Sequence, residues 1–189
     1  MILQWHSIRR INPARHGRLA GGYTLIELLL IVVIMGIVAV SAIPVMGQSI
    51  QARQGASRDE AVRLFEYARG RAIAGGIPSG VFVDVNNSTL RLVTLDDDES
   101  IINMLDPIDG GIKQTALSIE YAGVSISSFV NGDGTSGSGT VWFDFRAEPH
   151  TRNEITGVFD ALFAQNATVT LSTGTLIVVH ANTGFVEDR

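Results

Sequence analysis

Glu27 is the side chain whose position in this sequence most clearly suggests chemistry. Its carboxylate immediately precedes an uninterrupted apolar run of 19 residues, Leu28 to Met46. A charged side chain inside hydrocarbon costs roughly 2.5–3.5 kcal/mol on insertion scales, so it persists there only with a partner. Two interpretations are therefore open. Glu27 either pairs with a positive group within the apolar layer, or lies at the level of the lipid headgroups and is solvated there.

Two further segments contain groups that bind ions in other proteins. Asp96 to Glu99 is a run of four acids, and clustered carboxylates are the ligands that Ca²⁺ prefers. Their spacing lacks the alternation of known calcium loops, so a solvated turn is the favoured interpretation. The Gly-rich segment 131–139 lacks the lysine and the following helix of a phosphate-binding loop. It is predicted to be a loop between strands.

The sequence contains few signs of a catalytic site. His150 and His180 could in principle combine with Asp144 and a serine, but nothing in the sequence fixes their mutual geometry. The spacings of a nucleophile elbow and of an H-E-x-x-H metal site are absent. The chain has no cysteine for a thiolate site or a disulfide. The sequence therefore predicts a protein that is not an enzyme and that binds no cofactor and no metal.

The element that must position Glu27 is an apolar helix. The run after Glu27 would form a helix roughly 28 Å long, close to the thickness of the bilayer hydrocarbon. It lacks the polar stripe of a soluble helix, so we predict a transmembrane helix over residues 23–46. The charged residues that precede Glu27 are all basic, which predicts a cytoplasmic N-terminus and an exported C-terminal part; they are Arg9, Arg10, Arg15 and Arg18.

The junction before this helix resembles a known processing motif. Gly21-Gly22 is followed by Tyr23-Thr24-Leu25-Ile26-Glu27 and the apolar run, which is similar to the class III leader of type IV pilins and type II secretion pseudopilins. The resemblance implies that a prepilin peptidase removes the leader, residues 1–22, by cutting between Gly22 and Tyr23, and methylates the new N-terminus at Tyr23. It also implies that Glu27 neutralises the N-terminal amine of a neighbouring subunit in a filament. Tyr23 replaces the phenylalanine that is usual in the family.

An amphipathic helix is predicted to continue the membrane helix over residues 47–76. The stop signal is Gly75-Gly76 followed by Pro78. Pro44 is expected to kink the helix because proline removes a backbone hydrogen bond and clashes with the preceding turn. The apolar residues of the segment recur on one face at the helical period, namely Ala61, Leu64, Phe65, Ala68 and Ala72.

Residues 77–189 are predicted to form a β-rich domain. The segments 81–85 and 89–93 flank the turn Asn86-Asn87-Ser88 and are typical of a hairpin. A helix followed by closely spaced strands indicates an α+β fold, in which the long N-terminal helix, with its membrane-spanning and amphipathic halves, packs on an antiparallel β-sheet domain. Further strands are predicted at 117–121, 124–129, 140–145, 167–171, 175–181 and 185–186.

The C-terminal part is similar to a narrower group within the family. The strand Trp142-Phe143-Asp144-Phe145 and the final segment Asn182-Thr183-Gly184-Phe185-Val186 resemble minor pseudopilins of the GspH/FimT type. Members that bind DNA carry basic residues around this last turn, whereas this chain has Phe185, Glu187 and Asp188. The formal net charge of −5 at pH 7 also argues against nucleic acid as a partner, because phosphates require Lys and Arg.

These features together predict an assembly protein. We expect a minor pseudopilin of a type II secretion pseudopilus, which assembles through its N-terminal helix and helps drive protein export across the outer membrane. The expected partners are other pilins or pseudopilins, the prepilin peptidase and the inner-membrane assembly platform. The expected location is the bacterial inner membrane, as a single-pass protein with a periplasmic C-terminal domain, and then the periplasmic pseudopilus. The alternatives are a minor pilin of a type IV pilus, for adhesion, motility or DNA uptake, and a signal-anchored periplasmic binding module that never polymerises.

Overall fold

The computed structural model describes residues 23–189, apart from the side chains of residues 40–48. The chain divides into two compact units, Met1–Pro44 and Val45–Arg189. The expected leader, including Gly22, lies outside the described residues, and so does the side chain of Pro44, where a kink is expected. Both expectations therefore stay predictions.

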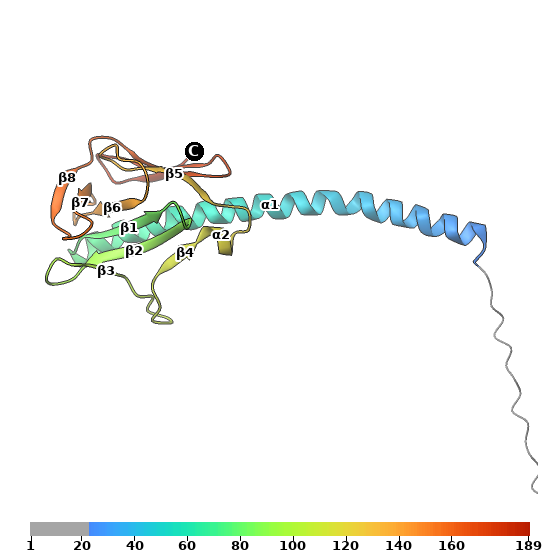
Figure 1. Ribbon diagram of the computed structural model, residues 1–189, viewed down its shortest axis with the longest axis horizontal. Helices are drawn as coiled ribbons and strands as arrows, with labels where there is room; N and C mark the ends of the chain where they lie inside the picture. Colours follow the sequence, from blue (N-terminus) through green and yellow to red (C-terminus); the bar gives the residue numbers. More distant parts are fainter. Residues whose placement is uncertain (1–22) are drawn as a thin grey trace, which may run out of the picture. The chain divides into compact units, whose positions relative to one another are not determined.

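Helix α1 spans Leu25–Gly75, a length of 51 residues (Figure 1). It ends at the predicted glycines. Gly76 follows with a φ of 67°, a left-handed conformation that glycine adopts without a steric penalty. The Gly76 N–H donates to the carbonyl oxygen of Ala72 at 3.0 Å, which satisfies one of the carbonyl groups at the helix end.

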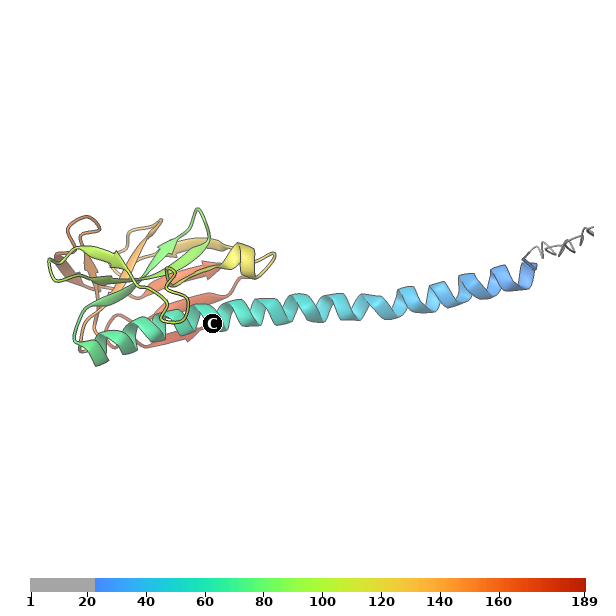
Figure 2. The same cartoon turned by 90° about the horizontal axis from the view of Figure 1, so that it is seen from below.

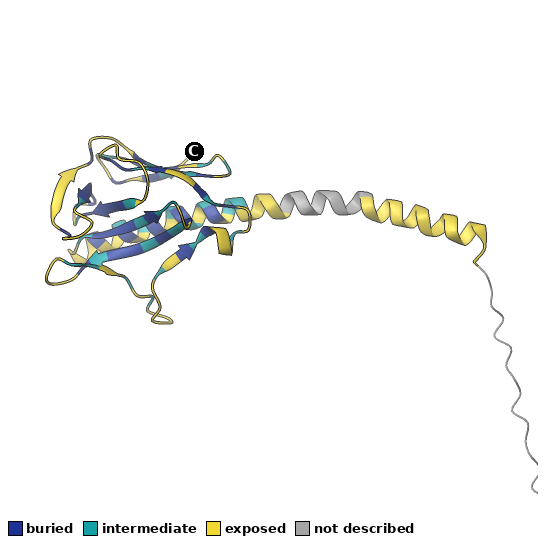
Figure 3. Ribbon diagram, viewed as in Figure 1, coloured by how far each residue is buried: buried dark blue, intermediate teal, exposed yellow. Residues whose placement is uncertain are grey.

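The described part of the first unit is Tyr23, Thr24 and the N-terminal part of α1. All side chains from Tyr23 to Ala39 are exposed (Figure 3). Among the residues that the structure describes, no helix is both long enough and apolar enough to cross a membrane. The predicted span over residues 23–46 includes residues 40–46, whose side chains lie outside that description.

The second unit contains two antiparallel sheets (Figure 1). The larger sheet has seven strands in the order β3-β2-β1-β6-β7-β8, with β4 also paired to β2, and the smaller sheet has the order β11-β10-β9-β5. The strands are β1 Ser79–Asp84, β2 Thr89–Leu95, β3 Ile101–Asn103, β4 Gln114–Ala116, β5 Ile126–Val130, β6 Gly139–Phe143, β7 Pro149–Arg152, β8 Phe159–Leu162, β9 Ala167–Leu171, β10 Leu176–Val179 and β11 Val186–Asp188, and the short helix α2 is Leu117–Glu120.

One hydrophobic core joins α1 to the inner faces of both sheets. Figure 2 shows the C-terminal half of α1 lying along the domain with the C-terminal strands beside it. The sheets contribute alternate residues, such as Val81 and Val83 of β1 and Val169 of β9. The helix contributes the predicted apolar stripe, which is confirmed because each member is at most 1% exposed: Ala61, Leu64, Phe65, Ala68 and Ala72.

The outer face of the larger sheet carries a second, smaller apolar cluster. Val93, Leu95 and Trp142 are buried there, with Phe82 and Ile101 packed against them. Strand alternation accounts for this cluster, because β1 directs Val81 and Val83 toward the core and therefore directs Phe82 to the opposite face. The larger sheet thus has side chains packed on both of its faces.

The α+β class and the antiparallel pairing are confirmed, and one predicted strand is wrong. The predicted hairpin is present as β1 and β2, which pair from Ser79↔Thr94 to Asp84↔Thr89. The predicted strand at 117–121 is wrong, because Leu117–Glu120 forms α2. Leu117 is buried whereas Ile119 is 82% exposed, so the apolar alternation that suggested a strand does not describe a sheet face.

Candidate functional site

The N-terminal end of α1 holds the residues that the sequence singles out for processing and assembly. Thr24 immediately precedes the helix, and Glu27 lies in its first turn. The Glu27 Oε2 atom accepts hydrogen bonds from the Thr24 N–H at 3.0 Å and from the Thr24 hydroxyl at 3.1 Å. The Glu27 N–H in turn donates to Thr24 Oγ1 at 3.3 Å. This reciprocal pattern is a capping box, which satisfies backbone donors that the start of a helix leaves free.

The capping box gives Glu27 a structural role that the sequence interpretation missed. The signal was available, since Thr24 and Glu27 have the T-x-x-E spacing of a capping box in front of an apolar run. Both bonds from Thr24 reach Oε2, and within the described part of the chain Oε1 accepts no hydrogen bond. One carboxylate therefore caps its own helix and still presents an oxygen to an outside positive group.

Tyr23 lies directly before the capping residue and is 79% exposed. The backbone N–H of Thr24 is already bonded to Glu27 Oε2. An N-terminus created at Tyr23 would therefore lie next to Thr24, whose N–H is bonded to the carboxylate of Glu27. The processing residue Gly22 lies outside the described residues, so cleavage and methylation at Tyr23 stay predictions.

Both ring nitrogens of His150 lie within hydrogen-bond distance of a partner. His150 is fully buried on β7. Its Nε2 accepts a hydrogen bond from Arg152 Nε at 2.9 Å, which places the ring proton on Nδ1, 3.2 Å from the carbonyl oxygen of Glu148. Burial lowers the pKa of His150, so the ring is neutral at pH 7. Asp144 accepts the N–H groups of Arg146 and Glu148, both at 2.8 Å, and closes the β6–β7 turn.

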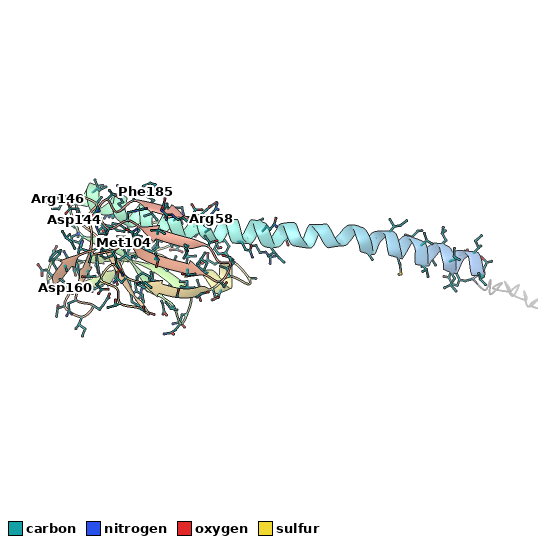
Figure 4. All side chains as sticks on the ribbon, turned by 90° about the horizontal axis from the view of Figure 1, so that it is seen from above. Arg58, Met104, Asp144, Arg146, Asp160 and Phe185 are labelled. Carbon is teal, nitrogen blue, oxygen red and sulfur yellow. The ribbon has the colours of Figure 1, made fainter. Side chains whose placement is uncertain are left out.

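His180 lies at the last turn of the chain, where charges are paired locally. Its Nε2 is 3.0 Å from Glu187 Oε1, and this contact is the main cause of a lowered Glu187 pKa. Arg189 pairs with the same carboxylate. Arg58 of α1, marked in Figure 4, pairs with Asp188 at 3.1 Å and ties the helix to β11. The histidines thus serve separate parts of the domain.

The acidic run and the Gly-rich segment are both connections between strands. Asp96 Oδ1 accepts the N–H of Asp97 at 2.9 Å, and Asp98 Oδ1 accepts the N–H of Ser100 at 3.0 Å, in the β2–β3 turn. Among the described residues, no group of three or more His, Cys, Asp or Glu side chains could hold a metal ion. The Gly-rich segment links β5 to β6, as predicted. Gly132 has no side chain, and a Cβ there would overlap the ring of Phe163.

No known protein-family model and no curated protein matches the sequence. Solved structures do match. The minor pseudopilin EpsH from the type 2 secretion system of Vibrio cholerae aligns with a TM-score of 0.52 and 13% identity, over 72% of this chain and 94% of that chain. The chain has a minor pseudopilin fold. A crystal structure of the same Vibrio cholerae protein aligns with a TM-score of 0.40 and 16% identity, over 67% of this chain and 92% of that chain.

The minor pseudopilin fold accounts for the arrangement of helix and strands. At 13% identity the likeness is one of fold. The capping box at Thr24 and Glu27 therefore stands at the start of the long helix of a pseudopilin-like chain.

Proposed function

We propose that this chain is a minor pseudopilin subunit of a type II secretion pseudopilus. The observation that carries the proposal is the fold likeness to EpsH, which extends over 94% of that chain. The motif Gly22-Tyr23-Thr24-Leu25-Ile26-Glu27 supports it, because it lies where α1 begins. In this role the chain would be a structural component of a filament that takes part in protein export.

Residues 23–46 would anchor the chain in the inner membrane before assembly. The large aliphatic side chains between Leu25 and Val38 are each at least 44% exposed. Apolar surface favours an apolar environment by roughly 25 cal/mol per Å², so this part of α1 requires lipid or other subunits around it. The arginines before Gly22 would keep the N-terminus in the cytoplasm and direct the domain to the periplasm.

Assembly would then depend on the N-terminal end of α1. A prepilin peptidase would cut between Gly22 and Tyr23 and methylate Tyr23. Glu27 Oε1 would face the amine of a neighbouring subunit, while Oε2 keeps its two bonds to Thr24. A charge pair of this kind removes the cost of placing either charge alone in an apolar layer.

The processing step provides a direct test. The full chain, extracted from membranes of bacteria with an active prepilin peptidase, should begin at Tyr23 and carry one methyl group by intact mass. Gly22→Asp should block cleavage without releasing the chain from the membrane, whereas Gly17→Ala, within the leader, should be processed normally. Retention of Met1 in the wild type would refute the proposal, and recovery of the uncleaved variant in the soluble fraction would refute the membrane anchor.

A second experiment separates the secretion system from a type IV pilus. Deleting the gene in its native host should reduce the amount of exported protein in the medium and leave pilus-dependent motility and DNA uptake unchanged. The wild-type chain should also co-purify with pseudopilins of the secretion system from detergent extracts. The opposite pattern, with export intact and pilus functions lost, would assign the chain to a pilus.

A further inference from the structure

The strand at one end of the larger sheet is held by few buried contacts. β8 pairs with β7 alone, and all four of its residues are exposed (Figure 3). A bulge interrupts this pairing between Thr151 and Arg152. The acid of β8, Asp160, accepts a hydrogen bond from the Thr151 hydroxyl at 3.4 Å. An element with so little buried surface can open locally at a lower free energy than the whole domain.

Two side chains of β7 fasten β8 and the connection that leads to it. Arg152 Nη1 donates to the carbonyl oxygen of Gly157 at 2.6 Å. The ring of His150 lies beside the ring of Phe159, with 5.4 Å between their centroids. On the other side, His150 pairs with Trp142 of β6. The His150 ring is therefore covered by β8 and becomes accessible to water when β8 moves away.

His150 and Arg152 also hold each other in place. Arg152 Nε donates to His150 Nε2 at 2.9 Å, and His150 Nδ1 is 3.2 Å from the carbonyl oxygen of Glu148. Arginine is charged at all relevant pH values and can only donate, so this bond requires an unprotonated Nε2. A proton on Nε2 would set two donors and two positive charges against each other. The pair thus exists only with a neutral imidazole.

The other groups around the ring do not remove this conflict. Burial lowers the pKa of His150, the carbonyl oxygen of Glu148 raises it, and the charges of Arg152 and Asp144 act in opposite directions. The carboxylate of Glu99, in the turn between β2 and β3, acts on Arg152. The part of β8 that meets the ring is aromatic and carries no charge. One acid therefore faces one arginine at a buried ring.

We propose that His150 and Arg152 form an acid-sensitive latch on β8: uptake of a proton by His150 breaks its bond with Arg152 and releases residues 153–162, while the rest of the domain stays folded. The opened ring carries its proton in water and not in a buried site, so lower pH favours the open form. Among the residues that the structure describes, the core packed against α1 includes none of 153–162. The latch is independent of the membrane helix and of the processing motif.

Hydrogen exchange of the full chain in detergent, at pH 7.5 and pH 5.5, tests the latch. In the open form His150 titrates at its ordinary pKa of 6.5, whereas the closed form keeps the ring neutral. The opening equilibrium should therefore rise about tenfold between the two pH values. After correction for intrinsic exchange rates, the amides of 153–162 should lose about tenfold in protection.

Low concentrations of urea, added at pH 5.5, show whether this opening is local. Local opening exposes little surface, so the protection of 153–162 should be nearly insensitive to urea. The amides of β9 and β10 open with the whole domain, and their protection should fall with urea. If 153–162 depended on urea as steeply as β9 and β10, the segment would open only by global unfolding and the inference would be overturned.

Two histidine variants assign the pH dependence. His150→Asn should abolish the tenfold change, because asparagine does not titrate. The matched control is His180→Asn, since His180 is the other histidine of the second unit, and this variant should keep the change. Unchanged protection in the wild type, or a tenfold change that persists in His150→Asn, would overturn the inference.

A measurement on the wild type decides the matter even if His150→Asn does not fold. By nuclear magnetic resonance, the His150 ring of the closed form should stay neutral, with its proton on Nδ1, down to pH 5.5. A ring that titrates near 6.5 while 153–162 stay protected would show that protonation does not release β8. Failure of the Gly22 processing test would leave this result untouched, so the two proposals fail separately.

Discussion

Glu27→Gln is the substitution that separates the two roles of Glu27. A glutamine at this position can still accept the bonds from Thr24, because capping boxes use Glu or Gln. It removes the negative charge, however, that would neutralise the amine of a neighbouring subunit. Thr24→Ala does the reverse, since it removes the hydroxyl from the capping box and leaves the carboxylate charged.

The expected magnitudes differ enough to decide between these roles. The hydroxyl of Thr24 takes part in two of the three bonds of the capping box. Loss of such a cap costs about 1 kcal/mol, or about fivefold in an equilibrium. An unpaired charge in the apolar layer costs roughly 2.5–3.5 kcal/mol, or about 60- to 300-fold. If Glu27 acts through its charge, Glu27→Gln should therefore be far more harmful than Thr24→Ala.

Incorporation into the filament is the quantity to measure. Wild type, Glu27→Gln, Glu27→Leu and Thr24→Ala would be produced at equal levels in the native host, and the fraction that co-purifies with the other pseudopilins would be compared. We expect both Glu27 variants to lose incorporation by a similar large factor and Thr24→Ala to retain most of it. Normal incorporation of Glu27→Gln, with failure of Thr24→Ala, would show that Glu27 acts as a cap. Equal incorporation of all four would mean that Glu27 is a solvated headgroup-level residue.

Three further predictions concern the second unit. A chain shortened to residues 49–189 should fold as a soluble monomer by sedimentation, because among the side chains of α1 that the structure describes the first buried one is Ser57; an aggregated or unfolded product would contradict this. In that chain, Leu64→Asp should lower the free energy of unfolding by several kcal/mol in urea titrations, since it places an unpaired charge in the core, whereas Arg71→Asp on the exposed side should change it by about 0.5 kcal/mol or less. Stability should also fall between pH 7 and pH 5, because unfolded His150 takes up a proton below its ordinary pKa of 6.5 while burial lowers its pKa in the folded chain. His150→Asn should flatten that part of the profile, and an unchanged slope would show that another group is responsible.

Elements that bury one regular face could be predicted from the sequence. Elements whose buried residues follow no regular pattern were missed. The stripe that includes Leu64 and Phe65 was recognisable because a long helix repeats its apolar face over several turns. Strand β8 was missed because all four of its residues are exposed at the edge of the sheet, which leaves no alternation to detect. Strand β7 was missed because it begins with Pro149 and buries His150 and Thr151 instead of aliphatic residues.

Features formed by neighbouring residues could be predicted from the sequence, and features that depend on strand pairing could not. The motif around Gly22 and Glu27 is local, so the sequence displays it completely. The row Gln114, Arg91, Phe82 and Thr140 is not local, because these residues come together only through the register of the paired strands β4, β2, β1 and β6. Register depends on which residues the core buries and on the turns between strands. That row could not be inferred without the structure.

The position of α1 in the core has a mechanical consequence. The stripe from Ala61 to Ala72 extends for roughly 17 Å along the helix axis, and it packs against both sheets. A force applied along α1 within the second unit, at Arg58 for example, would act parallel to this interface and load its contacts together, in shear, instead of separating them one after another. The Arg58–Asp188 ion pair adds a contact between the helix and the C-terminal strand β11. Within the second unit, α1 would therefore transmit a push or a pull to the sheets without a compliant hinge between Ala61 and the strands.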